Sequence, residues 1–91
     1  MLESEIEKKV CEYAKSQGWL TFKFTSPGNR HVPDRIFIKD SAVFFVEFKR
    51  KNLCPTKAQH QLACKIRSHN IEVYVVDCFD SGKELIHSFT A

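Results

Sequence analysis

The sequence predicts a small α/β fold, in which a mixed central sheet with an antiparallel hairpin is flanked by helices in the order α-β-β-β-α-β. The run at 43–49 is short, apolar and rich in β-branched and aromatic residues, which is typical of a central strand covered on both faces. Residues 2–17 have the periodicity of an amphipathic helix. Residues 56–59 match a helix capping box, and a further apolar strand follows at 72–76.

Length and composition limit what the chain can be. Its 91 residues, 43% of them apolar, suffice for one modest core, so we expect a single domain over 1–91. A net charge of +3 is only a weak indication of a nucleic-acid partner. The four cysteines have no zinc-like spacing, and we see neither a signal peptide nor a long apolar run. We therefore expect free thiols in a reducing cytoplasm, without a membrane partner or a small-molecule cofactor.

The predicted first helix carries four glutamates that differ in position. Its apolar face combines Leu2, Ile6, Val10, Tyr13 and Ala14. Glu5 and Glu12 fall on the opposite face, whereas Glu3 and Glu7 project from the apolar side. Helical periodicity alone leaves open whether Glu7 has a buried role or lies at the rim.

A first strand and an exposed loop follow the helix. Residues 19–25 alternate with period two, so we expect Leu20, Phe22 and Phe24 to share the core face. Residues 26–31 contain Pro, Gly and Asn, which are typical of a turn. This loop carries Arg30 and His31, and it is either a plain connector or a contact surface beside the site.

The hairpin is predicted to bring acidic and basic groups together. Strand 35–39 follows Asp34, the turn lies at 40–41, and strand 43–49 returns antiparallel. This pairing places Asp34 near Glu47 and Lys49, which share one strand face with Val43 and Phe45. Charged groups at the end of a buried strand are costly unless they have a partner or a chemical role.

The second helix follows a basic loop at 50–55 and extends to about residue 68. Thr56 is the predicted N-cap, and Gln59 at the third helical position completes the capping box. Gln59 also projects from the apolar face that Ala58, Leu62, Ala63 and Ile66 form, whereas Gln61 points away. Residues 77–91 are expected to be a loop with a short terminal helix or strand.

Two converging carboxylates are poor neighbours unless a cation lies between them. Hard oxygen ligands without Cys or His suit Mg²⁺ or Mn²⁺. Such an ion can bind a phosphate oxygen and lower the pKa of a bound water. Lys49 could orient that water or offset negative charge. The alternative is a structural salt bridge of Asp34 or Glu47 with Lys49 or Arg35.

The pattern Pro33-Asp34…Glu47-x-Lys49 with a downstream Gln59 resembles the PD-(D/E)xK nuclease superfamily, and within it the VRR-NUC family. The matching stretches lie at 3–7, 23–28, 32–35, 45–49 and 55–59, and together they cover about residues 3–77. His31 departs from the Gly that usually precedes Val-Pro-Asp in that family, which we interpret as a change in loop conformation or substrate contact. The resemblance implies a restriction-endonuclease-like core.

The resemblance also implies divalent-metal-dependent cleavage of DNA. Asp34 and Glu47 would bind the metal together with the Phe48 carbonyl, and Glu7 would complete the site directly or through water. Lys49 would be the base or electrostatic stabiliser, and Gln59 would position the site. Phosphates would be neutralised by basic residues nearby, and the candidate DNA-binding residues are Arg30, His31, Arg50, Lys51 and Lys57.

Small stand-alone members of this family resemble homodimeric Holliday-junction resolvases in phages and bacteria. We therefore expect a homodimer that acts on four-way junctions in the cytoplasm of a bacterium or a phage-infected cell. Two alternatives stay open: a nicking or restriction-type nuclease without junction preference, and a non-catalytic DNA-binding module that keeps the fold.

Overall fold

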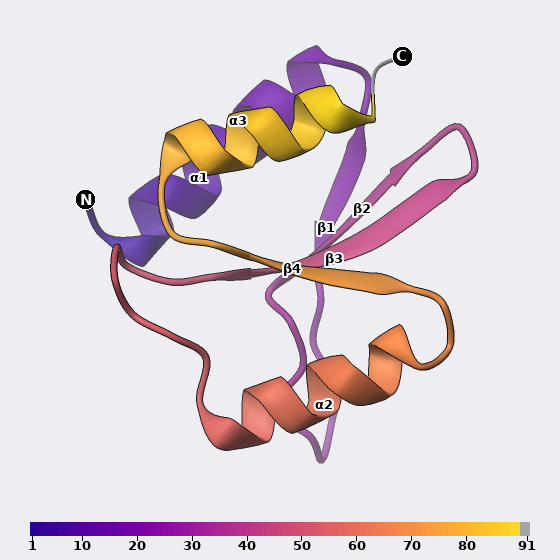
Figure 1. The fold of residues 1–91 in the computed structure, drawn as a ribbon. Helices are drawn as coiled ribbons and strands as arrows, with labels where there is room; N and C mark the ends of the chain where they lie inside the picture. The colour runs from indigo at the N-terminus through magenta and orange to yellow at the C-terminus, as the bar shows by residue number, and fades with distance from the viewer. Residues whose placement is uncertain (90–91) are drawn as a thin grey trace.

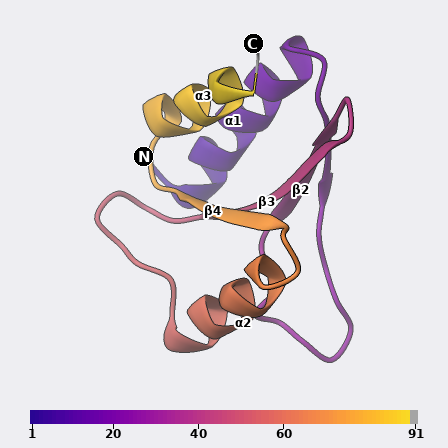
Figure 2. The same cartoon turned by 45° about the vertical axis from the view of Figure 1, so that its right-hand side comes forward.

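The computed structural model describes residues 1–89, which form one mixed sheet between two layers of helices (Figure 1). In chain order the elements are α1 (Glu3–Ser16), β1 (Leu20–Lys23), β2 (Arg35–Lys39), β3 (Ala42–Phe48), α2 (Lys57–Arg67), β4 (Glu72–Val76) and α3 (Phe79–Ser88). The sheet order is β1-β2-β3-β4, antiparallel except for the parallel pair β3 and β4. The expected α/β architecture is confirmed, and α1 and α3 cover one face while α2 lies on the other (Figure 2).

The hairpin of β2 and β3 holds the central register. Phe37 pairs with Phe44, and Ile36 with Phe45, around a turn in which Asp40 and Ser41 have positive φ angles of 48° and 72°. The backbone N–H of Asp34 donates to the Val46 carbonyl at 3.0 Å, which continues this pairing beyond β2. Asp34 is thereby fixed beside the last residues of β3.

The main core lies between the sheet and the helices α1 and α3. It contains the stacked rings of Phe37 and Phe44, whose centroids lie 5.2 Å apart, together with Ile6 and Val10 of α1. In the segment 77–91, expected to be a loop with a short helix or strand, Phe79–Ser88 form the ten-residue helix α3, and residues 90–91 lie outside the described part of the chain. This helix packs closely on α1, because a Cβ at Gly82 would lie only 2.5 Å from Val10 Cγ2.

The prediction for the first strand was wrong about which face is buried. Leu20 and Phe22 are 58% and 56% exposed, whereas Trp19 and Thr21 are buried against α1. The Trp19 ring lies 5.2 Å from that of Phe44, and Cys11 Sγ lies 3.9 Å from Thr21 Oγ1. The period-two alternation shows which side chains of the strand lie on the same face. It does not show which face is buried, because that depends on where α1 packs.

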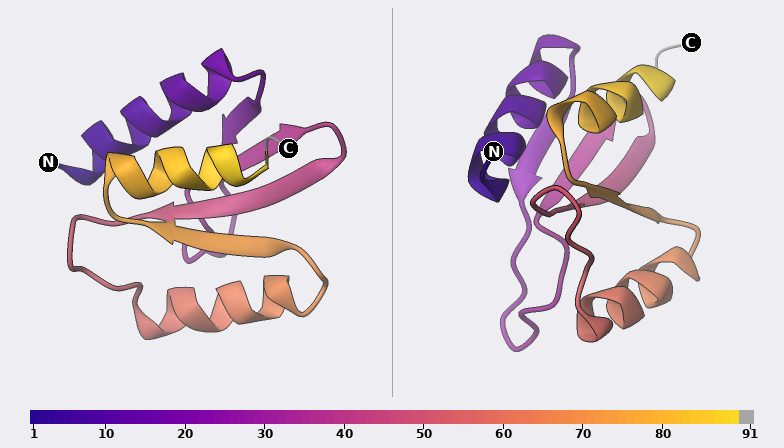
Figure 3. Two further views of the ribbon diagram at one scale, coloured as in Figure 1. Left: turned by 45° about the horizontal axis from the view of Figure 1, so that its top comes forward. Right: turned by 60° about the vertical axis from the view of Figure 1, so that its left-hand side comes forward.

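Coverage of β3 on both faces was also overestimated. Val43 is 38% exposed, and Phe45 is only partly buried, because α2 lies under β4 and leaves the other strands open on that face. Leu2, expected on the apolar face of the first helix, is 56% exposed at its N-cap. One face of the sheet is therefore only partly covered, as Figure 3 shows.

The helix α2 begins as predicted. Thr56 Oγ1 accepts the Gln59 N–H at 3.2 Å, and Gln59 Oε1 accepts the Thr56 N–H at 2.9 Å, which confirms the capping box. The buried Ala63 and Val73 lie at the contact between α2 and β4. None of the helices within residues 1–89 is long and apolar enough to cross a membrane.

Candidate active site

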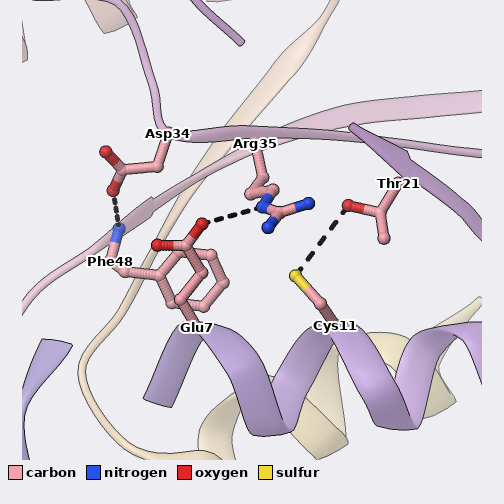
Figure 4. A network of polar contacts seen from close by, with 6 residues as sticks. All are labelled: Glu7, Cys11, Thr21, Asp34, Arg35 and Phe48. Atoms are coloured by element: carbon pink, nitrogen blue, oxygen red, sulfur yellow. Dashed lines mark hydrogen bonds and ion pairs between the residues drawn. The ribbon is translucent and has the colours of Figure 1, made fainter. Parts of the chain in front are cut away.

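Asp34 is held from three sides where the hairpin ends. Its Oδ2 accepts the N–H of Phe48 at 2.7 Å, and its carbonyl accepts the N–H of Phe24 at 2.9 Å (Figure 4). With the bond from its own N–H to Val46, these contacts fix both the backbone and the carboxylate. Asp34 thus bridges the end of β1 and the end of β3.

Glu47 is the strongly perturbed acid of this region. It is only 5% exposed, and Gln59 Nε2 lies 3.4 Å from its Oε1. Burial first, and then the charge of Asp34 and a hydrogen bond with Asp34, raise the pKa of Glu47 to about 8. The two carboxyl groups are therefore within hydrogen-bonding distance of each other.

Lys49 lies on the same side of the hairpin end as Glu47. Its charge lowers the pKa of Glu47, against the larger effects of burial and Asp34. Its backbone N–H donates to the Val76 carbonyl at 3.0 Å, which extends the β3–β4 pairing. The single ion pair recorded among residues 1–89 joins Arg35 and Glu7, so the salt bridges considered for Asp34 and Glu47 are not formed there.

The two inward glutamates of α1 have different partners. Glu7 Oε2 lies 2.7 Å from Arg35 Nε, directly beside Asp34 in the chain, as Figure 4 shows. Glu3 Oε1 accepts the Arg50 N–H at 3.3 Å, and its charge contributes to the raised pKa of Glu47. Both are partly buried, whereas Glu5 and Glu12 are exposed, so the helical periodicity separated them correctly.

Sequence reasoning singled out Glu7 and gave Glu3 no role in the site. Periodicity placed both on the packed side, and only the resemblance favoured Glu7. The signal that points to Glu3 is the backbone of the loop after β3, which folds back onto the first turn of α1 through Arg50. A contact between residues so far apart in the chain has no local sequence pattern.

Asp34 and Glu47 suit a hard divalent cation. Each offers carboxylate oxygens, they approach closely, and their mutual repulsion raises the pKa of Glu47, which a cation would relieve. No cluster of three or more His, Cys, Asp or Glu side chains arranged for a metal occurs in the described part of the chain. Glu7 is engaged by Arg35 instead. The Phe48 carbonyl as a further ligand stays a prediction.

The loop 24–34 forms one wall beside Asp34. The His31 N–H donates to Asn29 Oδ1 at 3.0 Å, and Gly28 turns the chain with a φ of 83°. A cavity of about 360 Å³ opens between this loop and Asp34, and its lining residues are Phe24, Thr25, Ser26, Asn29, Arg30, Val32 and Asp34. The exposed Arg30 therefore lies at the rim of a space that reaches the site.

Charge is distributed unevenly along the chain. Residues 48–71 contain no Asp or Glu, although they carry six of the 14 Lys and Arg residues, namely Lys49, Arg50, Lys51, Lys57, Lys65 and Arg67. The remaining residues therefore sum to −3, because the total charge is +3. Lys57 and Lys65 are exposed on the outer side of α2. Basic charge thus extends from the site along α2.

Comparisons with known proteins agree with this geometry. The chain is 33% identical over 79 residues to a protein named "Putative nuclease p44" from Acyrthosiphon pisum secondary endosymbiont phage 1, covering 86% of this chain and 85% of that protein. A solved structure described as a VRR_NUC domain superposes with a TM-score of 0.88 at 27% identity, covering 96% of each chain. No family model matches the chain.

Proposed function

The chain belongs to the VRR-NUC family of nucleases, and from this premise we propose that it is a divalent-metal-dependent endonuclease that hydrolyses DNA phosphodiester bonds. The observation that carries the proposal is the approach of Asp34 to the buried Glu47. A buried carboxyl group beside a second carboxyl group is costly to a fold, and a bound cation would offset that cost.

Each site residue has a distinct proposed task. Asp34 and Glu47 would hold Mg²⁺ or Mn²⁺. The ion would supply a contact to a phosphate oxygen and would lower the pKa of a bound water. Gln59 fixes one oxygen of Glu47 through its amide N–H. Lys49 stabilises negative charge on the phosphate or orients the attacking water. Arg35 forms an ion pair with Glu7, and Glu7 would complete the metal site directly or through water.

DNA is held by the basic residues around this site. Arg30 and His31 lie on the loop beside Asp34, and Arg50, Lys51 and Lys57 lie between β3 and the start of α2. Contacts with phosphates set affinity and position but do not directly read the base sequence. Specificity must then come from the shape of the DNA.

We propose that the active form is a homodimer that resolves four-way junctions. A junction has near two-fold symmetry, and a dimer with a two-fold axis presents two identical sites to two opposed strands. A chain of 91 residues offers little surface with which to hold four arms alone.

Cleavage of two DNA substrates tests the proposal. Supercoiled plasmid and a four-way junction are incubated with Mg²⁺, with Asp34→Ala and Glu47→Ala as site variants and with excess EDTA. We expect both variants to lose cleavage while they still bind DNA, because each loses one carboxylate ligand. Cleavage that persists in either variant or in EDTA contradicts the metal assignment. Equal cutting of linear duplex and junction contradicts the resolvase function alone.

A further inference from the structure

The sheet face that α2 leaves uncovered is a docking surface, and we propose that its partner is a second copy of this chain. The proposal rests on the homodimer proposed above and assigns the surface through which it forms. We call the surface the open face, and it comprises Leu20, Phe22, Ile36, Ile38, Val43 and Phe45.

The strand register makes the open face continuous. Leu20 pairs with Ile38, and Ile38 pairs with Val43, which gives one row across three strands. In the neighbouring row, Phe22 pairs with Ile36 and Ile36 with Phe45. Because side chains alternate along a strand, both rows project from the same side of the sheet. No charged residue belongs to either row.

The open face is unusually exposed for apolar side chains in neighbouring strands. Leu20 and Phe22 are 58% and 56% exposed, and Val43 is 38% exposed. An aromatic side chain buries roughly 150–250 Å², so Phe22 alone leaves on the order of 100 Å² to solvent. Contiguous apolar patches on soluble monomers rarely exceed a few hundred Å², and larger ones mark interaction sites.

The area and position of the open face suit an isologous contact. Its two rows sum to on the order of 300 Å² of apolar surface, about two thirds of the roughly 450 Å² of apolar area in a standard interface of about 800 Å² per partner. The residues around the two rows must then supply the rest of the contact. Two sheets pack about 10 Å apart, and α2 already occupies that layer under β4 (Figure 2). A two-fold partner can therefore lie beside α2, under β1 and β2.

An uncharged surface favours a copy of itself over a nucleic acid. The basic residues that suit phosphates lie on the loop 24–34 and on the segment 48–71, outside the open face. An isologous contact needs a patch that is complementary to itself, and a purely apolar patch meets that condition without matching charges. Asp34 and Glu47 project from the same side of the sheet, in the row beyond Ile36 and Phe45. Pairing through the open face would therefore place the two active sites beside the dimer contact and leave both basic segments available for DNA.

Sedimentation velocity of the full chain at micromolar concentration tests the assignment. We expect a dimer for the wild type and a dissociation constant raised roughly tenfold or more for Phe22→Lys. Phe22 is already half exposed, so the monomer should tolerate the substitution, and circular dichroism checks its fold. Leu2→Lys is the matched control, because Leu2 is equally exposed, at 56%, but lies at the N-cap of α1, away from the open face. This control should remain a dimer.

If Phe22→Lys fails to fold, Leu20→Thr replaces it, because Thr favours strands and removes the apolar contact. A wild type that is monomeric, or a Phe22→Lys or Leu20→Thr variant that dimerises as tightly as the wild type, overturns the inference. Mg²⁺-dependent plasmid nicking is measured in parallel. If the wild type is a dimer that does not cleave DNA and Phe22→Lys is a monomer, the result supports the open face as the dimer contact. The same result contradicts the proposed nuclease activity.

Discussion

The side-chain amide of Gln59 connects two structures at once, because its Nε2 lies 3.4 Å from Glu47 Oε1 while its Oε1 accepts the N–H of Thr56. The first contact belongs to the candidate site, and the second belongs to the capping box of α2. The start of α2 is therefore fixed relative to the end of β3 by one side chain.

Gln59→Ala should lower both activity and stability, but not in proportion. Loss of the cap costs about 1 kcal/mol or less in the free energy of unfolding. Loss of the N–H to Glu47 should reduce cleavage in protein that is still folded, because one carboxylate oxygen loses its positioning contact. Plasmid nicking rates and thermal unfolding measure the two effects separately.

Thr56→Ala is the control, since it removes the capping oxygen and leaves Gln59 Nε2 free to contact Glu47. It should lose stability with little loss of cleavage. If both variants lose cleavage only as far as they lose stability, Gln59 has a structural role alone.

The raised pKa of Glu47 makes stability depend on pH. The group titrates near 4.5 when unperturbed and at about 8 in the folded protein. Between these values the folded state binds more protons, so the free energy of unfolding falls as pH rises, by at most about 1.4 kcal/mol per pH unit. Glu47→Gln should remove this slope, and denaturant unfolding from pH 5 to 9 measures it.

Divalent cations should offset the loss of stability at high pH. A cation that binds the deprotonated Glu47 competes with the proton on that carboxyl, so Mg²⁺ should stabilise the wild type more at pH 8 than at pH 6. Glu47→Gln should show a much smaller increase in melting temperature at either pH. A magnesium effect that is equal at both pH values contradicts this linkage.

Substitutions of the two inward glutamates of α1 should affect cleavage in different ways. Glu7→Gln should reduce cleavage strongly, because the pair with Arg35 beside Asp34 is lost. Glu3→Gln should shift the pH–rate profile to lower pH, because the negative charge that raises the pKa of Glu47 is removed. The exposed Glu5 and Glu12 are matched controls on the same helix. Equal effects at all four positions would indicate a general electrostatic effect.

The fold was largely predictable because local patterns agree with its packing. The hairpin 35–48, the Thr56 capping box and the inward side of α1 follow from alternation, cap chemistry and helical periodicity. The buried side of β1 was not predictable, since apolar residues occur on both of its faces and α1 decides between them. The contact between Glu3 and Arg50 depends on loop closure over many residues.

Close packing of α3 on α1 predicts a penalty at Gly82. Alanine normally favours a helix by about 1 kcal/mol over glycine. At this position, however, the added Cβ would lie 2.5 Å from Val10 Cγ2 and 3.2 Å from Val76 Cγ1, both on buried side chains. Gly82→Ala should therefore lower the melting temperature, and a rise would mean that α3 can shift away from α1.

The outer side of α2 should hold DNA beyond the site. Lys57 and Lys65 are eight residues apart, which is about 12 Å along a helix and the axial length of roughly three to four base pairs. If each contacts a phosphate, Lys57→Gln and Lys65→Gln should each reduce the slope of log affinity against log salt by about 0.9. Fluorescence anisotropy with a duplex in EDTA measures this without cleavage.

Lys83 provides the matched control, because it is an exposed lysine on α3, on the other face of the sheet from α2 (Figure 2). Lys83→Gln should leave the salt slope unchanged, since α3 belongs to the acidic part of the chain and lies away from the basic segment. An equal loss of slope in all three variants would mean that only net charge matters. An unchanged slope in Lys65→Gln would restrict the DNA contact to the first turn of α2 and the loops around Asp34.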